Sequence, residues 1–168
     1  MNAQQLFTLS GAAAIAGGLL RIFVAFPLVT DPVTLEWLYT SIDVLLLFGL
    51  MGIYLSRAER LGFLGFAGFA VAVAALSFIG GPDADPFGFS TYEQGATSLA
   101  IAMVGLSIAW LQRGERPIWA PLCWIGSVVA VGVFALIPGL ASYGVMAAGV
   151  LFGLGFALAG IDLVRPRA

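Results

Sequence analysis

The sequence predicts an all-α, polytopic membrane protein in which six transmembrane helices form three antiparallel hairpins of one bundle. Three observations predict this fold class. The 168 residues are 61% hydrophobic and only 10% charged, whereas soluble domains are about half apolar and a quarter charged. The apolar residues form six long runs, and the arginines that flank these runs all fall on one side of a six-span arrangement. We therefore expect a single six-helix transmembrane domain over residues 1–168.

Each apolar run is long enough to cross a bilayer as a helix. A hydrocarbon core of ~30 Å needs about 20 residues at ~1.5 Å per residue. A helix satisfies its backbone hydrogen bonds internally, as hydrocarbon requires, and the runs lack the two-residue alternation of a barrel strand. The expected spans are residues 5–28, 34–56, 61–80, 92–112, 117–137 and 140–163.

The breaks between the spans contain residues that end helices or remain in water. They comprise residues 27–32, 57–60, 80–86, 113–117 and 138–139. Four of the five contain proline, which lacks the amide donor that a helix interior needs, and the remaining one, 57–60, contains two arginines. The amino terminus lacks the basic region of a secretory signal, so we expect the first span to be retained in the mature protein.

The distribution of charge predicts the orientation. Six arginines flank the spans on one side: Arg57, Arg60, Arg113, Arg116, Arg165 and Arg167. The other side carries acidic residues and no basic residue: Asp31, Glu36, Asp83, Asp85 and Glu93. Cytoplasmic loops of membrane proteins have an excess of basic residues. We therefore expect both termini in the cytoplasm, and we expect the host membrane to be a prokaryotic plasma membrane.

Two sequence patterns suggest internal organisation. GLMGIYLSRAER (49–60) aligns without gaps to GLSIAWLQRGER (105–116), and ALAGIDLVRPR (157–167) is a weaker third copy. These copies predict three same-sense repeats; the alternative is that every inward-running helix ends in apolar residues followed by arginine. Small residues recur in Gly62-x-x-Gly65-x-x-Gly68 and in Gly149-x-x-x-Gly153-x-x-x-Ala157.

Small-residue rows let helix backbones approach closely in lipid. We expect these rows to pack against other helices of the same chain. The alternative is that the Gly-rich helix faces mediate self-association or contact with other membrane subunits.

Missing residue types exclude several functions. The chain has no histidine and no lysine, and Cys123 is its single cysteine. Retinal Schiff bases, histidine-ligated haem or zinc, iron–sulfur clusters and histidine-dependent triads are therefore excluded. We assign no catalytic residue and expect no cofactor and no metal. The net charge of −2 gives no reason to expect a nucleic-acid partner, so the expected surroundings are the lipid bilayer.

Arg21 and Asp43 are the charged residues expected deepest in the hydrocarbon. Counting from the outer ends of their spans puts both ~9–13 Å down at ~1.5 Å per residue. An isolated charge in hydrocarbon costs roughly 2.5–3.5 kcal/mol, so we predict an Arg21–Asp43 ion pair that faces the bundle interior. Nearer the cytoplasm, we expect Asp162 to pair locally with Arg165.

Further polar residues surround this predicted pair. Glu36, Tyr39, Thr40 and Asp43 recur at three- and four-residue steps and so share a helix face, and Tyr92 and Glu93 open the fourth span at the same level. The candidate binding residues are Arg21, Glu36, Tyr39, Thr40, Asp43, Tyr92 and Glu93.

These residues predict an outward-facing polar vestibule that binds or transports a small solute or ion. One alternative is that Arg21 and Asp43 only fix the register of their helices. A second is an accessory or scaffold subunit of a larger membrane complex with no site of its own.

Overall fold

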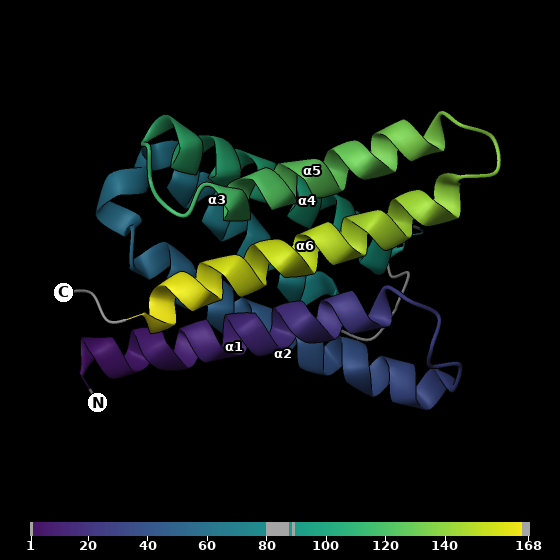
Figure 1. The fold of residues 1–168 in the computed structure, drawn as a ribbon, viewed down its shortest axis with the longest axis horizontal. Coiled ribbons are helices and arrows are strands. Elements are labelled where there is room, and N and C mark those ends of the chain that lie inside the picture. The colour runs from purple at the N-terminus through teal and green to yellow at the C-terminus, as the bar shows by residue number, and fades with distance from the viewer. Residues whose placement is uncertain (1, 80–87, 89, 166–168) are drawn as a thin grey trace.

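The computed structural model describes residues 2–79, 88 and 90–165, and these residues form an all-α structure of six helices (Figure 1). The helices are α1 (Ala3–Val24), α2 (Pro32–Leu55), α3 (Ala58–Ile79), α4 (Thr91–Gln112), α5 (Trp119–Ala135) and α6 (Ala141–Val164). All except α5 are long and apolar enough to cross a membrane. The predicted outer-loop residues Asp83 and Asp85, and Arg167 near the carboxyl terminus, lie outside the described residues.

Successive helices alternate in direction, so the chain termini and the α2–α3 and α4–α5 connections lie at the same end of the bundle (Figure 1). We call this the arginine end, because it holds Arg57, Arg60, Arg113, Arg116 and Arg165. The opposite end holds Asp31, Glu36 and Glu93, and we call it the acidic end.

Two helices are shorter than the sequence predicts. Helix α1 ends at Val24 and not near residue 28, because Pro27 disfavours helical geometry at the residue before it. Helix α5 has 17 residues, and prolines lie just beyond each of its ends. Turns continue from it on both sides, since the N–H of Leu122 donates to Ile118 O (3.3 Å) and the N–H of Ile137 to Phe134 O (3.2 Å).

Helices α1 and α6 approach each other through glycine. A Cβ atom built at Gly11 would lie 2.8 Å from the Gly160 carbonyl oxygen, well inside normal contact distance. Gly153 lies still closer to the backbone of Gly18, with the Gly18 carbonyl oxygen nearest to its Cβ position. The predicted packing of the Gly149–Gly153–Ala157 row is thus confirmed as intramolecular, and this face is covered by α1. Self-association through it is therefore not supported.

The first glycine of the α3 row has a different role from the one predicted. Gly68 packs against the α4 backbone, where a Cβ would lie 2.8 Å from Ala102 O. Gly62 instead kinks α3, with φ 64° and ψ −165°, a conformation that residues with a Cβ rarely adopt. The Arg113 guanidinium lies beside it, with Nη2 3.1 Å from the Cβ position.

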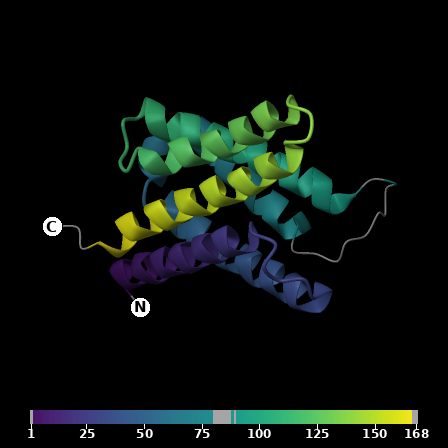
Figure 2. The same ribbon diagram turned by 45° about the vertical axis from the view of Figure 1, so that its right-hand side comes forward.

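The α3–α4 hairpin is attached to the bundle by few contacts. Within the described residues, the backbone of α3 comes close to α2 and that of α4 to α5, and the backbone of the hairpin approaches no other helix. Near the arginine end, Tyr54 stacks on Phe69 (4.1 Å between ring centroids) and Trp110 meets Trp124 edge to face (6.0 Å). Figure 2 shows the hairpin separating from α1 and α2 toward the acidic end.

We predict that Gly153→Ala destabilises the fold by about 1–3 kcal/mol, because the added methyl group has no space against the α1 backbone. Gly132→Ala on α5 is the matched control, since no atom lies within 4 Å of its Cβ position. Thermal unfolding in mild detergent measures both. Equal melting temperatures for the two variants would contradict the close α1–α6 contact.

Candidate functional site

Arg21 lies in the last turn of α1, at the acidic end. Its Cζ atom is 5.9 Å from the centroid of the Tyr39 ring on α2, within the ~6 Å range of a cation–π contact. On α6, a Cβ built at Gly149 would lie 3.9 Å from the same Cζ. The guanidinium therefore lies between α2 and α6, where the missing side chain of Gly149 leaves room for it.

Arg21 and Asp43 are at the same level of the bundle. Gly17 of α1 packs against Leu46 of the antiparallel α2, with 3.0 Å from the Gly17 Cβ position to Leu46 Cδ2. Four residues further along α1, Arg21 is thus level with residues 41–42, and Asp43 is the next residue of α2.

The predicted ion pair does not form: no hydrogen bond joins Arg21 to Asp43, and the ion pairs among the described residues involve other arginines. The reason is the direction of Asp43. The α2 residues that contact α1 include Leu45, Gly49 and Gly52. At 3.6 residues per turn, Asp43 points between a third and half of a turn away from that row. The charge of Arg21 still acts on Asp43 over a longer distance.

The rest of the predicted polar face lies along the outer half of α2. Glu36, Tyr39 and Thr40 are exposed, and Asp43 is partly buried. The Thr40 hydroxyl donates to the Glu36 carbonyl oxygen (2.9 Å), so that hydroxyl is already used by its own helix. Asp43 makes no hydrogen bond with any described residue, and its carboxylate is open to another partner.

Asp31 adds a fixed negative charge at the start of α2. The Thr34 hydroxyl and the Thr34 backbone N–H (2.8 Å) both donate to its carboxylate, which caps the helix. These bonds lower the pKa of the Asp31 carboxyl below its usual value. The acidic end therefore stays negatively charged at neutral pH.

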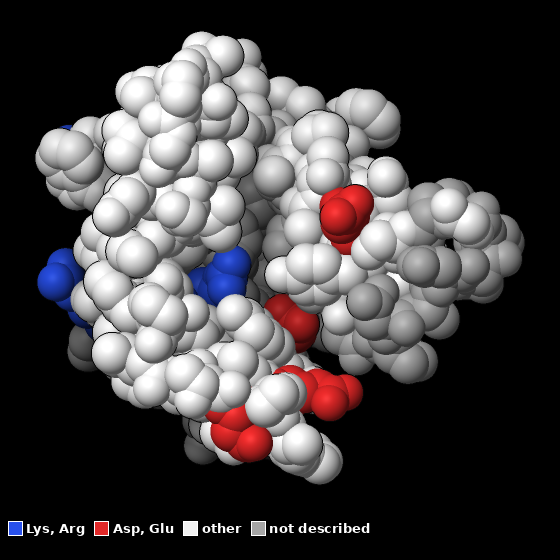
Figure 3. All heavy atoms as spheres, turned by 90° about the vertical axis from the view of Figure 1, so that its right-hand side faces the viewer, with Lys and Arg blue, Asp and Glu red and all other residues white. Residues whose placement is uncertain are grey.

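Tyr92 and Glu93 lie at the same end of the bundle as the polar residues of α2. Both are exposed at the start of α4, and within the described residues the backbone of α4 does not come close to that of α1, α2 or α6. Viewed from the acidic end, the molecule is hollowed, with basic atoms inside the hollow and acidic atoms beside it and around it (Figure 3). The structure thus brings Arg21 of α1 to the α2 candidates, and leaves the α4 pair on a helix whose backbone stays apart from both.

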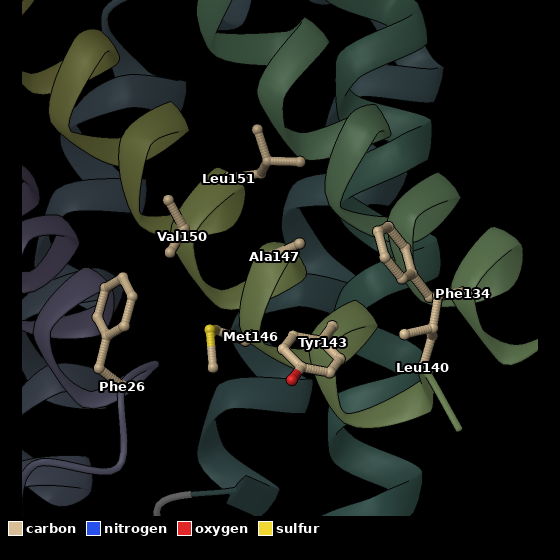
Figure 4. Close-up of a pocket in the computed structure, with 8 residues that line it drawn as sticks. All are labelled: Phe26, Phe134, Leu140, Tyr143, Met146, Ala147, Val150 and Leu151. Carbon is tan, nitrogen blue, oxygen red and sulfur yellow. The ribbon is translucent and has the colours of Figure 1, made fainter. Parts of the chain in front are cut away.

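A separate apolar groove of about 690 Å³ lies at the acidic end between α1, α5 and α6. Figure 4 shows Phe26 and Phe134 on opposite sides of it. Its lining is Phe26, Phe134, Leu140, Tyr143, Met146, Ala147, Val150 and Leu151. Neither Arg21 nor Asp43 borders this groove, and its composition suits the acyl chains of lipid.

The arginine end contains a buried charged cluster that the sequence did not predict. Arg57, between α2 and α3, is only 2% exposed. Its Nη2 atom donates to Asp162 of α6 and to the Arg116 carbonyl oxygen (3.1 Å). Its Cζ atom lies 4.2 Å from the centroid of the Trp110 indole. We call Arg57, Trp110, Glu115, Arg116 and Asp162 the Arg57 cluster.

Glu115 completes this cluster from the α4–α5 connection. Its Oε2 atom lies 4.0 Å from Arg57 Nε, and its Oε1 atom forms an ion pair with Arg60 Nη1 at 3.0 Å. Its backbone carbonyl oxygen also accepts a hydrogen bond from Trp110 Nε1 (2.9 Å). One guanidinium thus joins the ends of all three hairpins, because its planar group presents several N–H donors at once.

Sequence reasoning treated Arg57 as an exposed turn residue and Asp162 as a local partner of Arg165. The structure instead gives Asp162 a partner 105 residues away. One signal was available: Glu59, Glu115 and Asp162 all fall among the arginines that flank the spans. Acidic residues in a basic region indicate specific pairing, but spacing alone does not say which pairs form.

Together, the helices and their exposed apolar side chains define the class of this protein: it is a polytopic α-helical membrane protein whose apolar helices contact the lipid bilayer. Comparison of the chain with protein-family models, curated proteins and solved structures finds no match in any of the three.

We predict that Arg57→Ala destabilises the protein by about 3–5 kcal/mol, because it removes the buried cation that Asp162 and Glu115 both face. Arg57→Lys restores little, since an ammonium cannot bond in the same fork. Arg60→Ala is the control: Arg60 is 54% exposed, so its loss costs less than about 1 kcal/mol. Denaturation in detergent tests this, and similar losses for Arg57→Ala and Arg60→Ala would contradict a structural role for the cluster.

Proposed function

We propose that this protein binds a small polar solute or ion at Arg21 and Asp43, through the opening at the acidic end, as a step in moving it across the membrane. The observation that carries the proposal is that these two opposite charges are level with each other and both lie near Tyr39, yet form no bond to each other. A charge within the hydrocarbon costs roughly 2.5–3.5 kcal/mol unless something compensates it. A bound ligand or water would supply that compensation.

Other side chains near the pair suit a binding site. The Tyr39 ring covers one side of the Arg21 guanidinium and lies four residues from Asp43, one turn away on the same helix. Glu36 stands at the mouth on α2, and Tyr92 and Glu93 stand on α4. We assign these residues to the walls of the vestibule, with Arg21 and Asp43 as its principal ligand-binding groups.

We further propose that α5 also crosses the membrane, giving six spans with both termini in the cytoplasm. At ~1.5 Å per residue, its 17 residues cover about 26 Å, and the turns at each end extend that length. The arginines at the end that carries the termini support this orientation.

The three same-sense repeats remain part of this proposal. In the alignment of the three segments, Tyr54, Trp110 and Asp162 occupy equivalent positions. Tyr54 and Trp110 are buried, and Trp110 and Asp162 both contact Arg57. Two of the three equivalent positions therefore meet at Arg57, which supports a repeat about an axis along the membrane normal.

An accessory or scaffold role is the second candidate. The sequence suggested this role because Gly-rich helix faces could contact other subunits. In the structure, however, α1 covers the Gly-rich face of α6, and Gly68 of the α3 row packs on α4. The remaining exposed surface is apolar and suits lipid. Purification in gentle detergent distinguishes the candidates, because a stable larger complex would favour the scaffold role.

We predict opposite-side labelling of Arg113→Cys and Ser142→Cys, which flank α5, in a Cys123→Ala background. A membrane-impermeant maleimide should label Ser142→Cys on intact cells and Arg113→Cys only after permeabilisation. Arg60→Cys serves as the control and should behave like Arg113→Cys. Labelling of Arg113→Cys and Ser142→Cys from the same face would show that α5 does not cross.

We predict that Asp43→Asn abolishes ligand binding while the protein stays folded, because the amide keeps the shape of a side chain that makes no hydrogen bond with any described residue. Melting temperature in lipid nanodiscs, with and without a panel of small ions and polar solutes, measures this. Glu59→Gln, an exposed acidic residue at the arginine end, is the control and should respond like the wild type. The opposite result would be that no solute changes the melting temperature of the wild type and that Asp43→Asn only lowers it. Asp43 would then have a structural role.

A further inference from the structure

The proposed site offers one fixed positive and one fixed negative charge, supplied by different helices. We propose, building on the function above, that its ligand is a small zwitterion. The ligand carboxylate binds the Arg21 guanidinium, and the ligand ammonium binds the Asp43 carboxylate. Recognition of this kind explains why the site contains both Arg21 and Asp43 although the two form no ion pair with each other.

The geometry places the two charges at a separation that a bridging ligand can use. Arg21 is level with residues 41–42, so Asp43 lies within two residues of it along the axis, or about 3 Å. Around the axis of α2, Asp43 is turned between a third and half of a turn away from the row that contacts α1. Both groups nevertheless lie near Tyr39, since Arg21 reaches its ring and Asp43 follows it by one turn on the same helix face, and no described side chain bonds to both.

Charge compensation favours a zwitterion over a simple ion. An anion at Arg21 would leave Asp43 uncompensated, and a cation at Asp43 would leave Arg21 uncompensated. A charge without a partner in an apolar setting is costly. A zwitterion compensates both groups at once and brings no net charge into the membrane.

The two protein groups also match the two ligand groups chemically. Arginine binds carboxylates through paired N–H donors, and an aspartate accepts the donors of an ammonium. The missing side chain of Gly149 makes room for the guanidinium itself. Tyr39 lies beside that guanidinium and one helical turn before Asp43, so its ring forms a wall next to both groups.

The rim adds discrimination against plain anions. Asp31, Glu36 and Glu93 give the acidic end a negative potential, which repels a simple carboxylate before it reaches Arg21. A simple cation passes the rim but meets the positive charge of Arg21. A zwitterion has no net charge, so neither the acidic rim nor Arg21 repels it as a whole.

The test compares alanine with two analogues that each lack one charge: propionate, without the ammonium, and ethylamine, without the carboxylate. β-Alanine and betaine extend the zwitterion series to other charge separations. Binding to the purified full-length protein in nanodiscs is measured by calorimetry. We expect at least one zwitterion to bind at least tenfold more tightly than either single-charge analogue.

Charge removal should then change the preference in a defined direction. Arg21→Gln should bind ethylamine more tightly than propionate, and Asp43→Asn should bind propionate more tightly than ethylamine, while Glu59→Gln keeps the wild-type order. Equal binding of a zwitterion and one analogue to the wild type overturns the zwitterion class and leaves the binding site standing. A folded wild type that binds none of these solutes and no inorganic ion overturns both proposals.

Discussion

The guanidinium of Arg57 bonds to groups from every hairpin, and the arrangement of the helices depends on that contact. Asp162 belongs to the last hairpin, Trp110 to the second, and Arg57 itself follows α2 of the first. Away from this cluster, the α3–α4 hairpin has only its neighbours α2 and α5 to hold it. The bundle is consequently tight at the arginine end and separated at the acidic end, which is where the hollow lies.

Glycine provides the second constraint on the bundle. Lipid gives apolar helices no hydrophobic reason to associate, so close backbone contact must replace it. Gly11, Gly18, Gly153 and Gly160 supply that contact between α1 and α6, which makes the first and last helices direct neighbours. The same approach brings Arg21 beside Gly149, so the position of the proposed binding charge follows from the packing of small residues.

The sequence predicted six helices, their order and the grouping of arginines, because apolar length and helix-breaking residues act locally. It placed the end of α1 too late, since a proline acts on the residue before it. It did not predict the bond between Arg57 and Asp162, because contacts between distant helices depend on rotation about each axis. The same limitation explains Arg21 and Asp43: their common level could be counted from the sequence, but the direction in which Asp43 points could not.

The unequal helix lengths have a consequence for the host bilayer. Helix α6 has 24 residues, or about 36 Å, whereas the 17 residues of α5 cover only about 26 Å. With α5 crossing the membrane as proposed, these neighbours can match a single hydrocarbon thickness only if α6 tilts or the lipid around α5 thins. Hydrophobic mismatch is therefore concentrated on one flank of the protein, and we expect its conformation to respond to acyl-chain length there before it does elsewhere.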